Sequence, residues 1–147
     1  MTVLRIISWA ATSLVAATLA TSVVSASAEP GGIWSMSNGK VTVRVNNCGG
    51  NLCAKIIGLR EPISKIDGEP KVDRENPDTS LRKRPLIGLQ ILIGMKPDGD
   101  GTWKGAIYNP DDGNTYSASV KLKGSEMKVK GCVASVLCKT NTFVRAQ

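Results

Sequence analysis

The sequence has no histidine, and aromatic residues make up only 4% of its 147 positions. Without histidine, Ser-His-Asp and Cys-His nucleophiles, imidazole acid–base catalysis and histidine-ligated metal sites are excluded. Paired carboxylates remain for catalysis, but the acidic residues are scattered through turn-forming stretches such as Asp98-Gly99-Asp100. These stretches lack the further ligands and closing Glu of a calcium loop. The sequence therefore predicts no enzyme activity, no catalytic residue, no metal site and no cofactor.

Long apolar runs are also scarce, and the one present lies at the N-terminus. Residues 1–28 combine Arg5, an apolar stretch and the small-x-small pattern Ala26-Ser27-Ala28, which together are typical of a secretory signal peptide. A membrane anchor is the less favoured alternative, because the stretch is rich in Ala, Ser and Thr and lacks a basic stop-transfer flank. We expect cleavage after Ala28, a single domain over residues 29–147, a periplasmic or secreted location, and no transmembrane anchor after processing.

Negative charge is in deficit, with 12 acidic against 19 basic residues and a net charge of +7. The predicted hairpin "VKLKGSEMKVK" separates apolar from basic residues by alternation. Its basic face consists of Lys121, Lys123, Lys128 and Lys130. Such a face is usually a solvated surface, although it could contact an envelope polyanion or protein. No aromatic residues lie between the lysines, so no nucleic-acid partner is expected.

Four cysteines follow the predicted leader, and an even number in an exported chain indicates disulfides. The favoured pairs are Cys48–Cys53 and Cys132–Cys138, because each would close a tight connection. Cross-linking between the two ends of the domain is the alternative if the first and last strands are neighbours. The spacings are wider than the CxxC motifs common in zinc sites.

About eight short apolar or alternating runs are separated by turn signals, such as Asn38-Gly39 between "IWSM" and "VTVRV". No run has a helical period. The pattern predicts an all-β, up-and-down antiparallel eight-stranded barrel, because closure removes the exposed edges of an open sheet.

One connection, Glu61–Arg84, is much longer than the others and contains the turn initiator Asn76-Pro77-Asp78. Its acids and arginines are balanced, so we expect it to pair internally as a lid beside the barrel mouth. The expected partners are Asp73 and Asp78 with Arg74, Arg82 and Arg84. In the alternative interpretation, Arg82 and Arg84 form an anion clamp over the opening.

Two tryptophans remain after the predicted cleavage, Trp34 and Trp103. In a closed barrel the last strand adjoins the first, so Arg145 could lie across the Trp34 ring and close one end. That role is structural. The candidate ligand-binding residues are Arg82, Arg84, Trp103 and Tyr108.

Several blocks of the sequence together resemble the DUF2147 family of small exported bacterial proteins. They are "CGGNLCAKI", "DRENPDTSLRKRPLIGLQIL", "WKGAIYNPDDGNTYSA" and "CKTNTFVRA". The resemblance implies a lipocalin-like (calycin) β-barrel and a family without an established activity. Two residues depart from the family pattern, Ala54 in place of Gly and Phe143 in place of Trp.

The leading hypothesis is a lipocalin-like protein that binds a small apolar or amphipathic ligand, since eight strands can enclose one small molecule. The alternative, from another class, is a structural or interaction module of the cell envelope with a solid barrel and a basic contact face. An apolar cavity beside the long connection favours binding, whereas a filled interior favours the interaction module.

Overall fold

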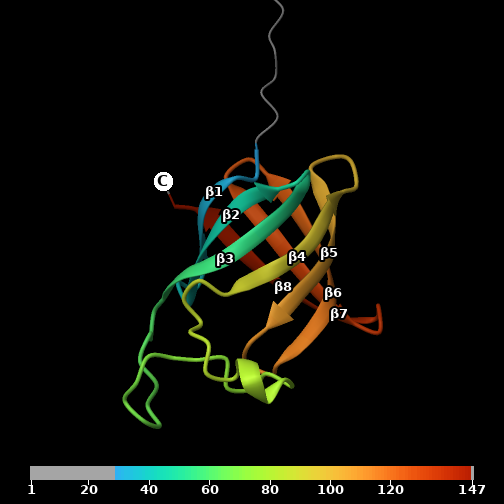
Figure 1. Cartoon of the computed structure of the whole chain (residues 1–147). Coiled ribbons are helices and arrows are strands. Elements are labelled where there is room, and N and C mark those ends of the chain that lie inside the picture. Colours follow the sequence, from blue (N-terminus) through green and yellow to red (C-terminus); the bar gives the residue numbers. More distant parts are fainter. Residues whose placement is uncertain (1–28, 147) are drawn as a thin grey trace, which may run out of the picture.

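Eight strands form a closed antiparallel barrel in the computed structural model, which describes residues 29–146 (Figure 1). Each strand pairs with the next in sequence, and β8 pairs with β1. The strands are β1 Gly32–Met36, β2 Val41–Cys48, β3 Asn51–Leu59, β4 Gln90–Pro97, β5 Thr102–Asn109, β6 Asn114–Lys123, β7 Glu126–Val133 and β8 Leu137–Arg145. The predicted all-β, up-and-down architecture is confirmed. The predicted signal peptide, residues 1–28, lies outside the described residues.

The helical content of the described chain is one 3₁₀ turn, η1 (Thr79–Leu81), within the long β3–β4 connection. Its N-cap is Asp78, whose side chain accepts a hydrogen bond from the Ser80 amide at 2.9 Å. Over residues 29–146, no helix has the length and apolarity needed to cross a membrane.

The two ends of the barrel differ. One end, which we call the closed end, carries both ends of the described chain and the short turns at residues 49–50, 98–101 and 124–125 (Figure 1). The other, the open end, carries the turns at residues 37–40, 110–113 and 134–136 and the connection 60–89. Figure 1 shows that connection extending below the barrel as irregular chain with the short turn η1 within it.

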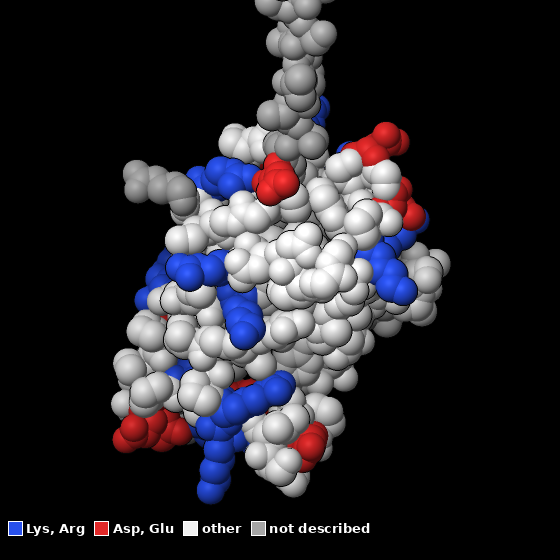
Figure 2. Space-filling view, turned by 45° about the horizontal axis from the view of Figure 1, so that its top comes forward, with Lys and Arg blue, Asp and Glu red and all other residues white. Residues whose placement is uncertain are grey.

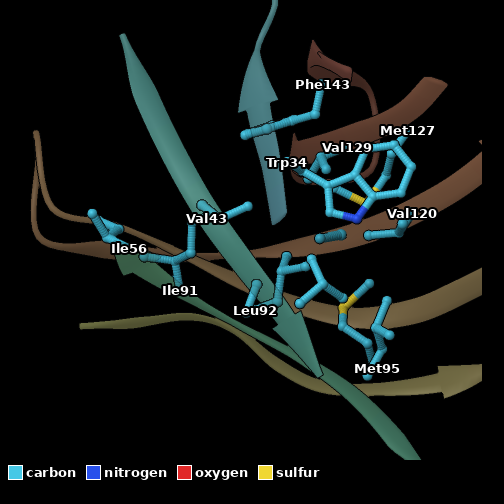
Figure 3. Close-up of a cluster of buried hydrophobic side chains, with 14 of the residues drawn as sticks. Trp34, Val43, Ile56, Ile91, Leu92, Met95, Val120, Met127, Val129 and Phe143 are labelled. Carbon is cyan, nitrogen blue, oxygen red and sulfur yellow. The ribbon is translucent and has the colours of Figure 1, made fainter. Parts of the chain in front are cut away.

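The packed core fills the part of the barrel nearer the closed end. Trp34, Val45, Met95, Val120 and Met127 are each 0% exposed. Figure 3 shows the Trp34 ring beside Val120, Met127 and Val129, whereas Ile56 and Ile91 lie together away from it. The alternation of strand side chains places these residues inside, so the apolar residues of each strand converge on one interior.

Arg145 closes the barrel seam at this end. It lies opposite Trp34 in the β1–β8 register, with its guanidinium carbon 4.4 Å from the centre of the indole ring. Its two terminal nitrogens donate to the carbonyls of Gly31 at 2.8 Å and Glu29 at 2.7 Å. The Trp34 Nε1 donates to the carbonyl of Pro30 at 2.8 Å. The predicted contact is present, and it ties the segment before β1 to the end of β8.

The disulfides are Cys48–Cys53, across the β2–β3 turn, and Cys132–Cys138, across the β7–β8 hairpin. Both favoured pairs are confirmed, and the cross-linking alternative is wrong. The first and last strands are neighbours, but each cysteine lies closest to a partner in its own hairpin, because Cys132 and Cys138 face each other in the β7–β8 register.

The predicted basic face lies on the outside of β6 and β7. Its four lysines are exposed, and Lys121 and Lys128 stand directly opposite each other on neighbouring strands. On the face shown in Figure 2, Lys and Arg side chains are spread widely, and Asp and Glu form smaller groups. The exterior therefore carries the positive charge while the interior is apolar.

Candidate ligand-binding cavity

A cavity of about 930 Å³ occupies the barrel at its open end. This volume lies toward the upper part of the range for small-molecule pockets, about 300–1,000 Å³. Its lining comes from all eight strands and from the adjoining turns and long connection. Strand β4 contributes Ile91, which lies beside Ile56 (Figure 3). The barrel is thus solid toward one end and hollow toward the other.

The inner wall of the cavity is apolar. Its buried members are Ile56, Leu86, Ile91, Val129 and Phe143, each less than 9% exposed. Met36, Val41, Leu59 and Ile107 are partly buried and pack against the same cluster.

Gly131 is a part of this wall against which the Ile107 side chain packs closely. It lines the cavity from β7, on the same face as Val129, and a Cβ placed there would be 3.2 Å from Ile107 Cγ2. Phe143 also lines the wall, so an apolar ring without a hydrogen-bond donor faces the cavity here.

The mouth, in contrast, is charged. The ionisable residues that border the cavity are Lys40, Arg60, Glu61, Lys71, Asp111, Asp112 and Lys139. They come from the β1–β2 and β5–β6 turns, from the long connection and, for Lys139, from β8. An apolar interior beneath a charged mouth is the arrangement expected for a molecule with one apolar and one polar part.

An ion pair joins opposite sides of this mouth. Lys40 Nζ, in the β1–β2 turn, lies 2.9 Å from Asp111 Oδ2, in the β5–β6 turn. Four strands separate the two turns in either direction around the ring. Both side chains are more than half exposed, so solvent and salt reach the pair.

Beside it, Asp112 is held by neutral donors. Its Oδ2 accepts hydrogen bonds from Tyr116 Oη at 2.7 Å and Asn109 Nδ2 at 2.9 Å, and its Oδ1 accepts from the Asn114 amide at 2.9 Å. Burial raises the pKa of Asp112, but the hydrogen bonds from Tyr116, Asn114 and Asn109 outweigh it and hold the pKa below the ordinary value.

The long connection is anchored to the barrel wall by Asp73. This residue is 0% exposed, and its carboxylate accepts hydrogen bonds from Tyr108 Oη at 2.6 Å, Asn76 Nδ2 at 2.8 Å and Arg84 Nε at 2.8 Å. Arg84 Nη2 lies 2.7 Å from the same carboxylate. The backbone adds a bond, since the Asp73 amide donates to the Arg84 carbonyl at 2.9 Å.

Opposing effects act on the pKa values in this anchor. Burial raises the pKa of Asp73, but the hydrogen bonds from Tyr108, Asn76 and Arg84 outweigh it and keep the pKa below 3.8. Burial, together with the bond to Asp73, raises the pKa of Tyr108 above 10.0. At neutral pH the carboxylate is therefore charged and the hydroxyl is protonated, as the donor and acceptor roles require.

A second contact fixes the connection over the β5–β6 turn. A Cβ at Gly113, which is buried and has φ +71°, would overlap the Glu75 carbonyl oxygen. The chain at Glu75 thus passes directly over the glycine backbone. Asp73 and this crossing hold the connection beside the mouth rather than free in solvent.

The four predicted ligand-binding residues do not lie together in one site, and three of them lie outside the lining of the cavity. Arg84 pairs with Asp73, and Arg82 Nε donates to the Asn76 carbonyl at 2.6 Å. Neither arginine borders the cavity, and nor does Trp103, which pairs with Val120 and packs against the core.

Tyr108 does border the cavity, but its hydroxyl is engaged by Asp73 and Asn76. Its place in the β5–β6 register, opposite Thr115, puts its side chain on the strand face opposite to that of Ile107. The predicted role of the four residues in ligand binding stays a prediction.

Two of the expected ion pairs inside the connection differ from the prediction. Asp78 caps η1 through Ser80 and makes no ion pair with an arginine in the described chain, while Arg74 pairs with Asp67. The reason is local geometry, because an Asx-type side chain at a turn start bonds the backbone two residues ahead. Asp73 is the acid that pairs with an arginine as predicted.

Residues at the cavity mouth, among them Lys40, Arg60, Lys71 and Lys139, were not predicted from the sequence. They lie in three separate parts of the chain, so no local motif brings them together. The available signal is positional for Lys40, Arg60 and Lys139, which lie near strand ends at the same end of an up-and-down barrel, and no such signal exists for Lys71.

These features define a class: a lipocalin-like β-barrel, plugged at one end and hollow at the other. Residues 32–145 match the family model described as "Uncharacterized protein conserved in bacteria (DUF2147)". The chain belongs to the DUF2147 family. The predicted resemblance is therefore confirmed.

A solved structure agrees with this fold. Protein HP1028 from the human pathogen Helicobacter pylori, described as belonging to the lipocalin family, matches with a TM-score of 0.69 and 25% sequence identity. The match covers 82% of this chain and 85% of HP1028. No curated protein matches the sequence.

Proposed function

We propose that this protein binds a small amphipathic molecule, with the apolar part inside the open half of the barrel and the polar part at the mouth. The observation that carries the proposal is the cavity of about 930 Å³, apolar inside and charged at its opening. The proposal assigns binding and no catalytic step, and it places the protein in the periplasm or the medium after export.

The position of the cavity supports binding over a purely structural role. It lies beside the long connection, bounded on that side by Lys71 and Leu86. A solid barrel would instead continue the packing around Trp34 to the other end. Burying an alkyl chain against such a wall contributes roughly 0.8 kcal/mol per methylene group, enough for useful affinity with a small ligand.

The likeness to HP1028 supports the same proposal, because that protein is described as a lipocalin. At 25% identity the likeness bears on the architecture, and the ligand has to be found from this chain's own cavity.

The direct test is native mass spectrometry of the full chain, expressed with its leader and purified under mild conditions, followed by organic extraction. We expect a co-purifying molecule, or saturable binding of the neutral fluorescent probe N-phenyl-1-naphthylamine. Repeated absence of both would contradict the proposal.

A matched pair of variants locates the binding. Gly131→Leu adds a side chain inside the cavity, and Thr140→Leu adds the same side chain on the exposed outer face of the adjacent strand. We expect Gly131→Leu to lower probe affinity at least about tenfold, because it occupies the ligand's space, and Thr140→Leu to leave it unchanged. Equal affinities in both variants would place the probe elsewhere.

A second candidate, an envelope interaction module, is favoured by one observation. Lys121 and Lys128 stand directly opposite each other, an arrangement that destabilises a sheet and gains from an anionic partner. Crosslinking in intact cells tests it. An adduct that is lost when Lys121, Lys123, Lys128 and Lys130 are changed to Glu supports this role, and an adduct unaffected by the change counts against it.

A further inference from the structure

Charge is distributed unevenly around the barrel mouth. The four cations are supplied by β8, the β1–β2 turn, and the chain that follows β3: Lys139, Lys40, Arg60 and Lys71. Strands β8, β1, β2 and β3 are consecutive in the closed ring. The acids Asp111 and Asp112 belong to the β5–β6 turn on the other side of the mouth. One arc of the opening is therefore predominantly basic.

The acids at the mouth already have partners. Asp111 pairs with Lys40 at 2.9 Å, and Glu61 lies 3.5 Å from Lys65. Asp112 accepts the hydrogen bonds described above. No acid at the mouth thus lacks a partner within residues 29–146, and a cationic head group would have to displace an existing contact.

Three of the cations are in the opposite situation. Within residues 29–146, the side chains of Arg60, Lys71 and Lys139 make neither an ion pair nor a hydrogen bond. Lys71 is partly buried, so part of this residue packs against the protein. An anion at this side of the mouth would therefore meet cations that it could pair with without breaking a contact of the described chain.

The position of Arg60 is set by the neighbouring turn. A Cβ at Gly39 would be 2.8 Å from Arg60 Nη2, so the guanidinium lies against the bare backbone of the β1–β2 turn. The Arg60 amide also donates to the Lys40 carbonyl at 3.1 Å. These contacts hold a planar donor group at the rim, and a guanidinium can give two parallel hydrogen bonds to a carboxylate or phosphate.

We propose that the bound molecule is a single-chain anionic amphiphile, whose carboxylate, phosphate or sulfate head is held by Arg60, Lys71 and Lys139 while its alkyl chain fills the apolar cavity. This inference rests on the proposed function and specifies the chemical class of its ligand. The head group stays at the mouth, where water still solvates it, so its charge is not fully desolvated.

The test uses probes that share a twelve-carbon chain and differ in the head. Dodecanoate and dodecyl phosphate are anionic, tetraethylene glycol monododecyl ether is neutral, and dodecyltrimethylammonium is cationic. Binding to the full mature chain is measured by displacement of N-phenyl-1-naphthylamine, below each probe's micelle concentration. We expect the anionic probes to bind about tenfold more tightly than the neutral one, and the cationic probe to bind most weakly.

Two triple variants distinguish an effect of the mouth residues on ligand preference from an effect of the protein's net charge. The first variant combines Arg60→Gln, Lys71→Gln and Lys139→Gln, and the control combines Lys121→Gln, Lys123→Gln and Lys130→Gln on the outer wall, with the same loss of three charges. We expect the mouth variant to abolish the preference for anions, so that it binds the anionic probes no more tightly than the neutral one. The control should keep the preference.

The outcomes distinguish this inference from the proposed function. Equal binding of all heads, sensitive to Gly131→Leu, would overturn the anionic class and leave the cavity proposal intact. An equal loss of the preference for anions in both triple variants would mean that this preference comes from net charge, and it would overturn the role of Arg60, Lys71 and Lys139. If no probe binds to a folded protein, the proposed function itself fails.

Discussion

The Tyr108 hydroxyl donates a 2.6 Å hydrogen bond to Asp73 Oδ1, joining two residues 35 positions apart in the chain. Tyr108 belongs to a barrel strand and Asp73 to the long β3–β4 connection, so this bond attaches the connection to the wall. Because Asp73 is fully buried, its charge depends on the donors around it. The connection is therefore part of the folded barrel, and its stability can be measured together with that of the barrel.

Removing the carboxylate should destabilise the protein substantially. Asp73→Ala leaves Arg84, Tyr108 and Asn76 without their shared acceptor. Breaking a buried charge pair costs about 3–5 kcal/mol, and we expect about 3 because the Arg84 side chain is 37% exposed. Urea unfolding followed by tryptophan fluorescence measures the change. The control Glu61→Gln breaks a surface ion pair with Lys65 and should cost no more than about 0.5 kcal/mol.

The same carboxylate predicts a dependence of stability on pH. Folding lowers the pKa of Asp73 below 3.8, so the unfolded chain holds the proton more tightly than the folded one. The resulting stabilisation is present above the ordinary pKa and is lost as the pH falls through the folded value. In urea unfolding between about pH 6 and pH 3, the difference between wild type and Asp73→Asn should shrink below about pH 4. A difference that stays constant with pH would exclude Asp73 as the titrating group.

Two glycines test the docking of the connection in a matched way. Gly113 and Gly124 both lie in hairpin turns with positive φ, +71° and +59°. A Cβ at Gly124 would meet nothing within 4 Å, whereas one at Gly113 would overlap Glu75. Gly124→Ala should cost about 1 kcal/mol from backbone strain alone.

Gly113→Ala should cost about 2 kcal/mol more, because the connection must also move away from the turn. Thermal unfolding gives the two values, and hydrogen exchange of the Asp73 and Asn76 amides reports displacement directly. Equal costs for the two variants would mean that the connection does not rest on Gly113.

Much of the architecture could be predicted because it follows from local patterns. Strand alternation and turn signals such as Asn38-Gly39 predict the order of the strands, and an up-and-down order allows closure. The Trp34–Arg145 contact follows from that closure, since it needs only β1 and β8 to be neighbours. The disulfides follow from short spacing within hairpins.

The cavity could not be predicted in the same way, because it depends on how side chains from distant strands fill the interior. Nothing in the local sequence shows that Trp34 fills one end of the barrel while the other end stays hollow. The internal pairing of the connection was predicted only in part. Charge balance predicted that Asp73 would pair with an arginine of the connection, but the selection of Arg84 for Asp73 and of Asp67 for Arg74 depends on the path of the folded chain.

The ion pair between Lys40 and Asp111 predicts that access to the cavity is gated electrostatically. It connects turns on opposite sides of the mouth, so a ligand must enter past it or break it. Exposed pairs contribute about 0.5 kcal/mol, so Asp111→Ala should barely change unfolding. It should nevertheless raise the association rate of N-phenyl-1-naphthylamine measured by stopped flow.

The probe is uncharged, so salt acts on the protein rather than on steering of the ligand. In the wild type, raising the salt concentration from about 0.05 M to about 0.5 M should screen the ion pair and raise the association rate of the probe. In Asp111→Ala the association rate should already be high at low salt and should change little as salt is added. Asp98→Ala, which removes the exposed ion pair with Lys104 at the closed end, is the matched control and should behave as the wild type does. A rate that is the same in all three proteins would mean that the turns open independently of this pair, and that ligands enter by another route past the mouth.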